Sequence, residues 1–199
     1  MMSFEITNEL LANITSYIEA SNDKRIVALF EEMHYADVAE ILDELAFDDV
    51  IYIIKLIDSE KTSAVLMELD EDIREKILQK LSAKEIAEEV EELDSDDAAD
   101  IIGELSEERQ EAVMSQIEDE EHVKEIEELL TYDEDSAGGL MAKELVKVNE
   151  NWSVLKCVRE MRSQAGEVTR VHSIYVVDDD KKLKGRLSLK DLLITSTKT

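Results

Sequence analysis

The sequence predicts a mainly α protein, in which an α-superhelix of short helices is followed by a small α+β unit. Three observations support this fold class. A twelve-residue pattern recurs seven times between residues 34 and 117. Residues 1–139 hold 42 acids and 10 bases, whereas residues 140–199 hold 8 acids and 12 bases. Apolar residues alternate in the manner of β-strands only after residue 140.

The repeat becomes visible when the chain is divided every twelve residues from His34 onward. The twelfth position is always Leu or Ile, the ninth is always apolar, and the eighth is apolar in six of seven units, with Glu89 as the exception. These three positions differ by three or four residues and therefore share one face of a helix. The twelfth position holds Leu45, Ile57, Leu69, Leu81, Leu93, Leu105 and Ile117, and the ninth holds Leu42, Ile54, Leu66, Leu78, Val90, Ile102 and Met114.

One continuous helix cannot use this pattern, because twelve residues exceed three full turns by about 120° and the apolar stripe would wander round the axis. The repeat instead predicts a run of short helices, each ended by a tight turn. The first position of five units is Asp or Ser, which suits an N-cap, and Ser82 with Glu85 forms a capping box. Helices this short need stacking against neighbours, as in an α-solenoid.

Two regions that flank the repeat are also predicted to be helical. Residues 4–20 and 23–33 indicate one or two additional helices before it. The segment Glu118–Leu130 predicts a longer exit helix with Val123, Ile126, Leu129 and Leu130 on one side.

Composition excludes several classes of protein. The 199 residues are 44% hydrophobic and carry a formal charge of −28, so the chain can bury a core. Its single cysteine, Cys157, excludes an internal disulfide framework. It shows no secretory signal, and its longest apolar runs, such as Val50–Ile54, are too short to cross a bilayer, which predicts a soluble chain. Nucleic acid requires clustered bases, so cations or basic surfaces are the expected partners.

The change in charge coincides with Gly138 and Gly139, which follow a long stretch whose only glycine is Gly103. A composition change and a conformationally permissive pair at one place indicate a domain boundary. We therefore expect a superhelical domain in residues 1–131 and a second domain in residues 132–199.

The second domain is predicted to contain a strand, a helix, two strands and a helix. Residues 145–148 alternate like a short strand, and Ser153 caps a helix that carries Val154, Leu155, Val158 and Met161 inward. Residues 173–177 and 183–187 predict a hairpin around an acidic turn. Ser188 begins a short helix that runs through Ile194.

The segment IYVVDDDKKLKGRLSLKDLL resembles the second half of a CBS motif. With the YDEDSAGGLM junction and the twelve-residue repeat before it, nearly the whole chain resembles the cytosolic region of MgtE-type magnesium transporters. This resemblance implies a right-handed superhelical domain, then a pair of CBS domains, a plug helix and a transmembrane magnesium pore. It also implies a homodimer at the cytoplasmic face of the membrane. The chain stops after the first CBS motif, so we expect a regulatory region that does not itself transport.

The resemblance also selects candidate Mg²⁺ ligands. In the family, magnesium ions bridge the acidic superhelical domain to the CBS region and plug helix and favour a closed pore. A pair of aspartates and a junction carbonyl that serve there match Asp96, Asp100 and Gly139. Another family position, a glutamate in some members, is Ala64 here. Carboxylates one helical turn apart suit a hydrated Mg²⁺ ion.

An ordinary structural explanation competes for every acidic group. Among 50 acids some pair at four-residue spacing is expected by chance, and a run of charges is usually a solvated face. The resemblance favours Asp96 and Asp100 alone. The acids of 88–92 and 118–121 are expected to be solvated.

The CBS-like ending offers a second candidate site, for an adenine nucleotide such as ATP. Ser188 and Asp191 resemble the hydroxyl and carboxylate with which CBS pairs hold phosphate and ribose, and Lys190 could add charge. Ser188 could equally act only as a helix cap, which is the explanation favoured by the residues themselves.

Catalysis is not expected, because the three histidines are scattered and no nucleophile triad, phosphate loop or zinc pattern occurs. Three hypotheses follow. The first is a magnesium-sensing region that gates an MgtE-like transporter. The second is an adenine-nucleotide sensor acting through the CBS motif. The third is a solenoid that binds proteins.

Overall fold

The computed structural model describes residues 5–133, 136–166 and 173–194. The chain divides into two compact units. The first unit contains the residues up to 93 together with 97–131, and the second contains 94–96 together with the residues from 132 onward. Each unit is described by itself below.

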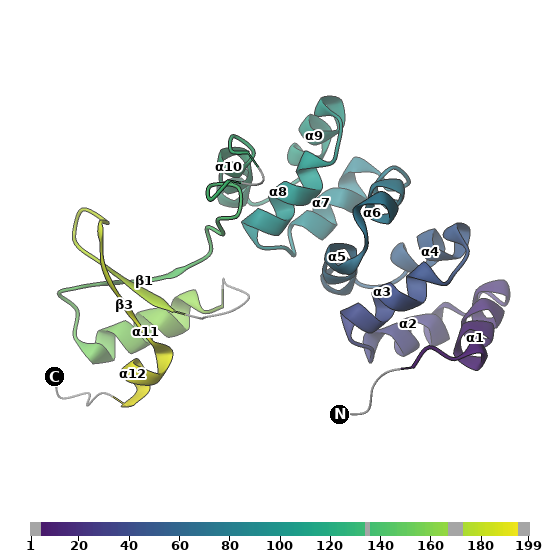
Figure 1. Cartoon of the computed structure of the whole chain (residues 1–199), viewed down its shortest axis with the longest axis horizontal. Helices are drawn as coiled ribbons and strands as arrows, with labels where there is room; N and C mark the ends of the chain where they lie inside the picture. The colour runs from purple at the N-terminus through teal and green to yellow at the C-terminus, as the bar shows by residue number, and fades with distance from the viewer. Residues whose placement is uncertain (1–4, 134–135, 167–172, 195–199) are drawn as a thin grey trace. The chain divides into compact units, whose positions relative to one another are not determined.

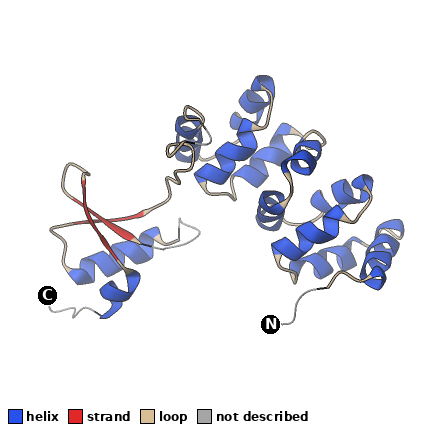
Figure 2. Cartoon of the chain, viewed as in Figure 1, coloured by secondary structure: helices blue, strands red, loops and turns tan. Residues whose placement is uncertain are grey.

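Short helices follow one another through the first unit, as Figures 1 and 2 show. They are α1 (Asn8–Glu19), α2 (Asp23–Glu31), α3 (Tyr35–Asp43), α4 (Phe47–Ile54), α5 (Ser59–Glu68), α6 (Glu71–Leu78), α7 (Ala83–Val90), α8 (Ser95–Gly103), α9 (Glu107–Met114) and α10 (Glu120–Leu129). The predicted run of short helices is therefore confirmed. The seven helices α3–α9 start at 35, 47, 59, 71, 83, 95 and 107, one residue after the start of each repeat unit.

The predicted caps are confirmed only in part. Ser82 and Glu85 form the expected capping box, and the Asp58 side chain accepts a hydrogen bond from the Glu60 N–H at 3.1 Å. Asp70 and Ser106 also precede their helices but make no side-chain capping bond. Their helices rely on the main-chain pattern and on packing.

The predicted apolar face is buried. At the eighth position of the repeat all six apolar residues are fully buried, and at the ninth all except the half-buried Met114 are buried. The fifth position is also buried in six of the seven units, which the sequence pattern did not reveal. Two of those six residues are polar, namely Thr62 and Arg74. Because some units carry a polar residue at the fifth position, this position does not show a consistent apolar pattern in the sequence.

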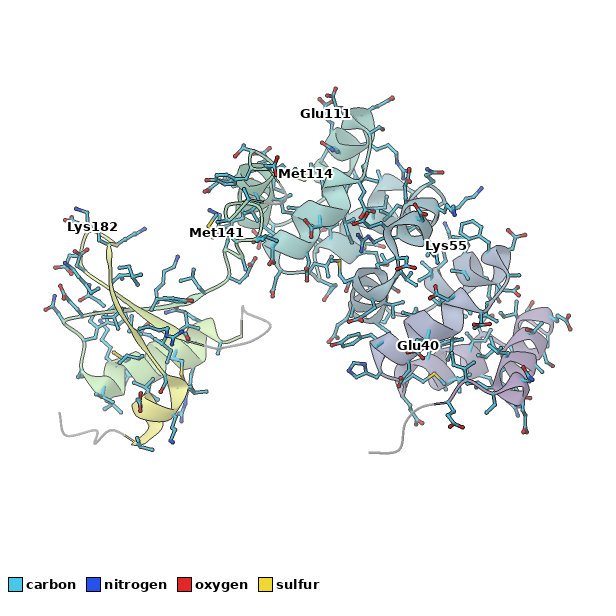
Figure 3. The ribbon with its side chains drawn as sticks, in the orientation of Figure 1. Glu40, Lys55, Glu111, Met114, Met141 and Lys182 are labelled. Carbon is cyan, nitrogen blue, oxygen red and sulfur yellow. The ribbon has the colours of Figure 1, made fainter. Side chains whose placement is uncertain are left out.

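Packing joins alternate helices, so that α3 contacts α5, α5 contacts α7, and α7 contacts α9. Basic side chains reinforce these contacts by donating to main-chain carbonyls about two repeats away. Lys61 Nζ donates to the Met33 carbonyl, and Arg109 Nη2 donates to the carbonyls of Leu78 and Leu81 at 2.9 and 2.8 Å. Lys55, labelled in Figure 3, pairs with Glu85 at 2.7 Å. Ion pairing with Lys55, aided by the Ser82 N–H, lowers the pKa of Glu85 to about 2.

The flanking predictions need two corrections. The first helix begins at Asn8, where the Thr7 hydroxyl accepts from the Leu10 N–H, and so is shorter than the predicted 4–20. Residue 4, the first of that range, lies outside the described residues. In the exit helix, Ile126 and Leu129 are buried as expected, but Leu130 is the C-cap and is exposed. The helix ends before Leu130 can join its apolar face.

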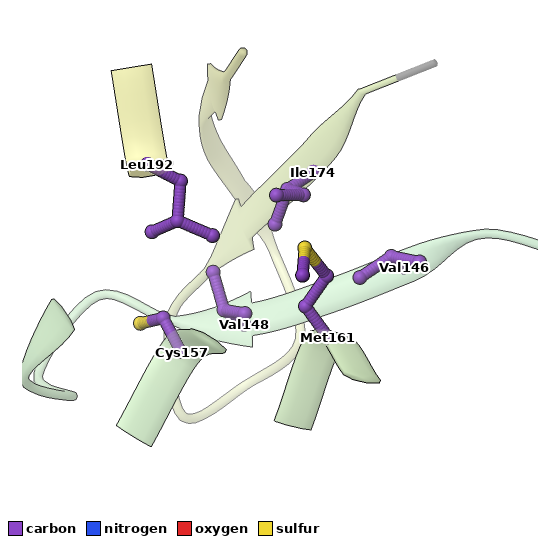
Figure 4. Close-up of a cluster of buried hydrophobic side chains, with 6 residues drawn as sticks. All are labelled: Val146, Val148, Cys157, Met161, Ile174 and Leu192. Atoms are coloured by element: carbon purple, nitrogen blue, oxygen red, sulfur yellow. The ribbon is translucent and has the colours of Figure 1, made fainter. Parts of the chain in front are cut away.

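The second unit has the predicted order of elements: β1 (Val146–Asn149), α11 (Val154–Gln164), β2 (Ile174–Val177), β3 (Leu183–Leu187) and α12 (Leu189–Ile194). The sheet order is β1-β2-β3, with β1 parallel and β3 antiparallel to β2. Figure 4 shows the buried cluster between the sheet and the two helices, which consists of Val146, Val148, Cys157, Met161, Ile174 and Leu192. Ser153 caps α11 as predicted, whereas Leu155, expected to face inward, is 55% exposed. Cys157 takes the buried position instead.

The Gln164 side chain protects the outer edge of β1. Its Oε1 accepts from the Lys147 N–H at 2.8 Å, and its Nε2 donates to the Lys147 carbonyl at 2.9 Å. A side-chain amide thus replaces a neighbouring strand at an edge that would otherwise offer free main-chain groups.

Among the described helices, none combines the length and the apolar character that a membrane crossing requires.

Arg74 provides a test of the first unit. Its side chain is 7% exposed, and its Nε donates to Glu104 Oε1 at 2.8 Å. Removing one partner of a buried ion pair leaves an uncompensated charge, so Arg74→Ala should lower the free energy of unfolding by roughly 3 kcal/mol or more. Urea unfolding followed by far-UV circular dichroism measures this change.

The double variant Arg74→Met/Glu104→Met serves as the control, because it removes both charges and keeps the volume. It should recover most of the stability that Arg74→Ala loses. A loss below about 1 kcal/mol for Arg74→Ala would show that the pair lies in a well-hydrated environment.

Candidate functional site

The acidic stretch 94–100 lies at the start of α8. The structure brings the predicted pair together, because Asp96 and Asp100 are one turn apart on this helix. Asp96 is half-buried and Asp100 is exposed, so both carboxylates border solvent. Two carboxylates one turn apart fit a Mg²⁺ ion that keeps most of its water and takes few protein oxygens. The remaining acids of the stretch, Asp94 and Asp97, are half-buried.

Glu144 accepts hydrogen bonds from Ser95, the first residue of α8, and the sequence did not predict this contact. Within the second unit, Glu144 Oε1 accepts from the Ser95 N–H at 2.8 Å, and its Oε2 accepts from the Ser95 hydroxyl at 2.9 Å. The Lys143 N–H donates to the same hydroxyl at 3.2 Å. Ser95 is fully buried. A carboxylate at a helix N-terminus satisfies main-chain donors and complements the helix dipole.

Nothing local in the sequence identifies this contact, because Ser95 and Glu144 are 49 residues apart. Ser95 and Glu144 fix the start of the helix turn that carries Asp96.

Gly139, the third predicted metal ligand, lies in the turn of residues 137–140. Its N–H donates to the Ser136 hydroxyl at 3.2 Å, and the Leu140 N–H donates to the Ser136 carbonyl at 3.1 Å. The adjacent Gly138 needs to be glycine for a steric reason, since an added Cβ would lie 2.5 Å from the Tyr132 ring. The Gly-Gly pair therefore forms a compact turn.

The predicted nucleotide residues begin α12. The Ser188 hydroxyl accepts from the Asp191 N–H at 2.9 Å, so Ser188 performs the capping role that the sequence suggested. Ser188, Lys190 and Asp191 are all exposed. Capping uses one lone pair of the hydroxyl, so its proton remains available for a ligand oxygen.

In its described residues, the first unit exposes mainly charged side chains. Of the large apolar side chains that are exposed in the described residues, Leu130 alone belongs to this unit. Protein-binding surfaces usually carry apolar anchors.

Fold and candidate site together define a class: a regulatory region in which an acidic helical superhelix precedes a CBS domain. Comparison with known proteins identifies the family. The family model described as MgtE intracellular N domain matches residues 33–135, and the CBS domain model matches residues 137–196. The chain belongs to the MgtE family.

Curated relatives are named Magnesium transporter MgtE. The protein of Thermus thermophilus is 44% identical over 68 residues, which is 34% of this chain and 15% of that protein. The protein of Enterococcus faecalis is 31% identical over 70 residues, which is 35% of this chain and 16% of that protein. These alignments thus span about a sixth of the relatives or less.

Two solved structures share the fold. The cytosolic domain of the Mg²⁺ channel MgtE in complex with ATP has a TM-score of 0.86 and 30% identity, over 94% of this chain and 77% of that one. The soluble part of a magnesium transporter has a TM-score of 0.80 and 22% identity, over 95% of this chain and 74% of that one. The second likeness bears on the fold alone.

The Glu144–Ser95 contact can be tested by amide hydrogen exchange. Glu144→Ala removes both acceptors of Ser95, so exchange at the Ser95 amide should accelerate by roughly tenfold or more, since such bonds to a charged group contribute about 1.5–3 kcal/mol. Glu144→Gln keeps one carbonyl acceptor and should give an intermediate rate. Glu150→Ala, an exposed carboxylate of the same unit, is the control. Equal exchange in wild type and Glu144→Ala would contradict the capping role.

Proposed function

We propose that this chain is the cytosolic regulatory region of a magnesium transporter or channel, located at the cytoplasmic face of the membrane in the full-length protein. It senses intracellular Mg²⁺ through acidic residues and so gates a pore that lies outside the chain. The observation that carries the proposal is the pair Asp96 and Asp100 on one face of α8, in a chain that is 30% identical to the cytosolic domain of an Mg²⁺ channel.

The mechanism follows from charge. Residues 1–139 carry 42 acids against 10 bases, so the superhelical domain repels other acidic surfaces when divalent cations are scarce. A Mg²⁺ ion held by Asp96 and Asp100, with the Gly139 carbonyl as a further ligand, neutralises part of this charge. With the ion held there, these residues would link the superhelical domain to the CBS region and plug helix. Bound Mg²⁺ favours the closed pore, and its loss lets the domains separate.

The partners in this proposal are a second CBS motif, a plug helix and a transmembrane domain in the full-length protein, which acts as a homodimer. The domain division proposed with it is 1–131 for the superhelical domain and 132–199 for the first CBS motif. The charged surface of the first unit supports this role over that of a protein-binding solenoid.

The sensing role predicts a specific effect in the full-length transporter. Asp96→Asn/Asp100→Asn should raise the Mg²⁺ concentration that half-protects the cytosolic region from protease by about tenfold, which corresponds to about 1.4 kcal/mol of lost binding free energy. The same variant should keep the pore open at Mg²⁺ concentrations that close the wild type, as measured by magnesium flux.

Glu107→Gln/Glu111→Gln is the matched control, because these residues form another exposed pair four residues apart on the neighbouring helix α9 (Figure 3 labels Glu111). This control removes the same charge without touching α8. A wild-type Mg²⁺ response of Asp96→Asn/Asp100→Asn would remove the pair from the sensing mechanism.

A second candidate function is binding of an adenine nucleotide at Ser188, Lys190 and Asp191. Its support is the relative solved in complex with ATP, together with the exposed hydroxyl and carboxylate at the start of α12. This function is compatible with magnesium sensing, because the two sets of residues are separate.

Calorimetry with ATP and the full-length protein tests this second function. Ser188→Ala/Asp191→Ala should weaken ATP binding by about tenfold or more, since each residue supplies a polar contact of roughly 1 kcal/mol. Asp180→Ala, which removes an exposed acid from the β2–β3 turn, should bind ATP like wild type. Equal affinity in all three proteins would place the nucleotide elsewhere.

A further inference from the structure

Glu89 of α7 occupies a position that is apolar in every other unit of the repeat. At this eighth position the other six side chains are fully buried, and Glu89 itself is only 8% exposed. The expectation that all acids of 88–92 are solvated is therefore wrong for Glu89, which lies in the core between helices because the eighth position of the repeat faces inward. The six apolar residues are Ile41, Ile53, Val65, Ile77, Ile101 and Val113.

Within the described residues, one oxygen of the Glu89 carboxyl makes no hydrogen bond that would offset the cost of burying it. Its Oε2 is buried, and the part of the chain that the structure describes offers this atom no hydrogen-bond partner. An ionised carboxylate in such a place is strongly destabilising, whereas a protonated carboxyl carries no charge to desolvate. Geometry therefore favours the protonated form.

The charges around Glu89 act in the same direction. Asp58, at the start of α5, and Glu85, Glu88 and Glu92, in or just after α7, are the acids that repel its charge. Lys55 and Lys84 are paired with Glu85 and Glu88. Helix α9 also packs against α7 and carries Glu107, Glu108, Arg109 and Glu111, of which Arg109 donates to the carbonyls of Leu78 and Leu81. Helix α5 carries Glu60, Lys61 and Glu68, of which Lys61 donates to the Met33 carbonyl. From α10, His122 Nε2 lies 3.3 Å from the Val90 carbonyl of α7.

Burial, reinforced by these acids, raises the pKa of Glu89 to about 8. The ordinary pKa of 4.5 applies to the unfolded chain. For a pKa raised by folding, the full stability is present below the unfolded value and is lost as the pH rises through the folded value. The sensitive range is therefore between pH 4.5 and about 8.

We propose that Glu89 is a proton-binding site within the superhelix, whose bound proton stabilises the contact between α5 and α7. The step is simple: a carboxylate oxygen takes a proton from water, and no other bond forms or breaks. Release of the proton leaves a buried charge and loosens the superhelix directly before α8, the helix that carries Asp96 and Asp100. The proposal goes beyond magnesium sensing, because it requires no metal.

The first test measures the titration midpoint of the Glu89 carboxyl in the wild-type protein. With ¹³C-labelled glutamate side chains and EDTA present, carboxyl chemical shifts are followed by NMR from pH 4 to 9.5. The Glu89 signal is assigned by its loss in Glu89→Gln, or in Glu89→Leu if the first variant folds poorly. We expect a midpoint near 8, as burial implies. A midpoint close to 4.5 would overturn the proposal.

The second test measures the consequence. Urea unfolding in EDTA compares wild type with Glu89→Gln, which mimics the protonated group. The ratio of the two unfolding constants, wild type over variant, should rise by up to tenfold per pH unit between pH 4.5 and about 8 and then level off.

Glu71→Gln is the matched control, because it removes the same charge from an exposed position in the first turn of α6, and Glu71 is not among the acids that repel the charge of Glu89. Its ratio to wild type should change little over this range. A ratio for Glu89→Gln that stays constant from pH 5 to 9 would overturn the proposal. Because both tests exclude divalent metal, their failure would leave the magnesium proposal standing.

Discussion

Packing between alternate helices is the constraint on which the first unit depends. A repeat of twelve residues does not match whole turns of an α-helix, so each helix must stop and start again. Helices of eight to ten residues are marginal alone and gain stability from the apolar face that they bury against a neighbour. The contacts of α3 with α5, α5 with α7 and α7 with α9 supply that burial. Arg109 and Lys61 add hydrogen bonds to carbonyls that these short helices leave at their ends.

The polar residues in this core differ in how they are compensated. Thr62 donates to the Asp58 carbonyl at 3.0 Å, and Arg74 is paired with Glu104, so each retains a partner after burial. Glu89 is repelled by nearby acids, and its Oε2 lacks a hydrogen-bond partner in the described part of the chain. The same low dielectric that strengthens the Arg74 pair therefore drives Glu89 toward its neutral form.

The candidate Mg²⁺ site depends on the local spacing of two aspartates and on a contact between residues far apart in the sequence. Helical spacing places Asp96 and Asp100 one turn apart, and the resemblance to the MgtE family selected them from the other acidic pairs of the sequence. Glu144 could not, since its contact with Ser95 depends on where the chain after the Gly138–Gly139 turn returns. The sequence thus led to the two candidate ligands but not to the carboxylate that fixes the start of their helix.

The sequence by itself determined the fold class, the start of each helix from α3 to α9 and the buried eighth and ninth positions, because local periodicity carries this information. It failed where a polar residue replaced an apolar one, as at Arg74, and where a helix end decided orientation, as at Leu130 and Leu155. Only the tertiary structure decided which helices pack together and which buried polar groups find partners. These properties depend on atoms far apart in the chain, and no short-range pattern records them.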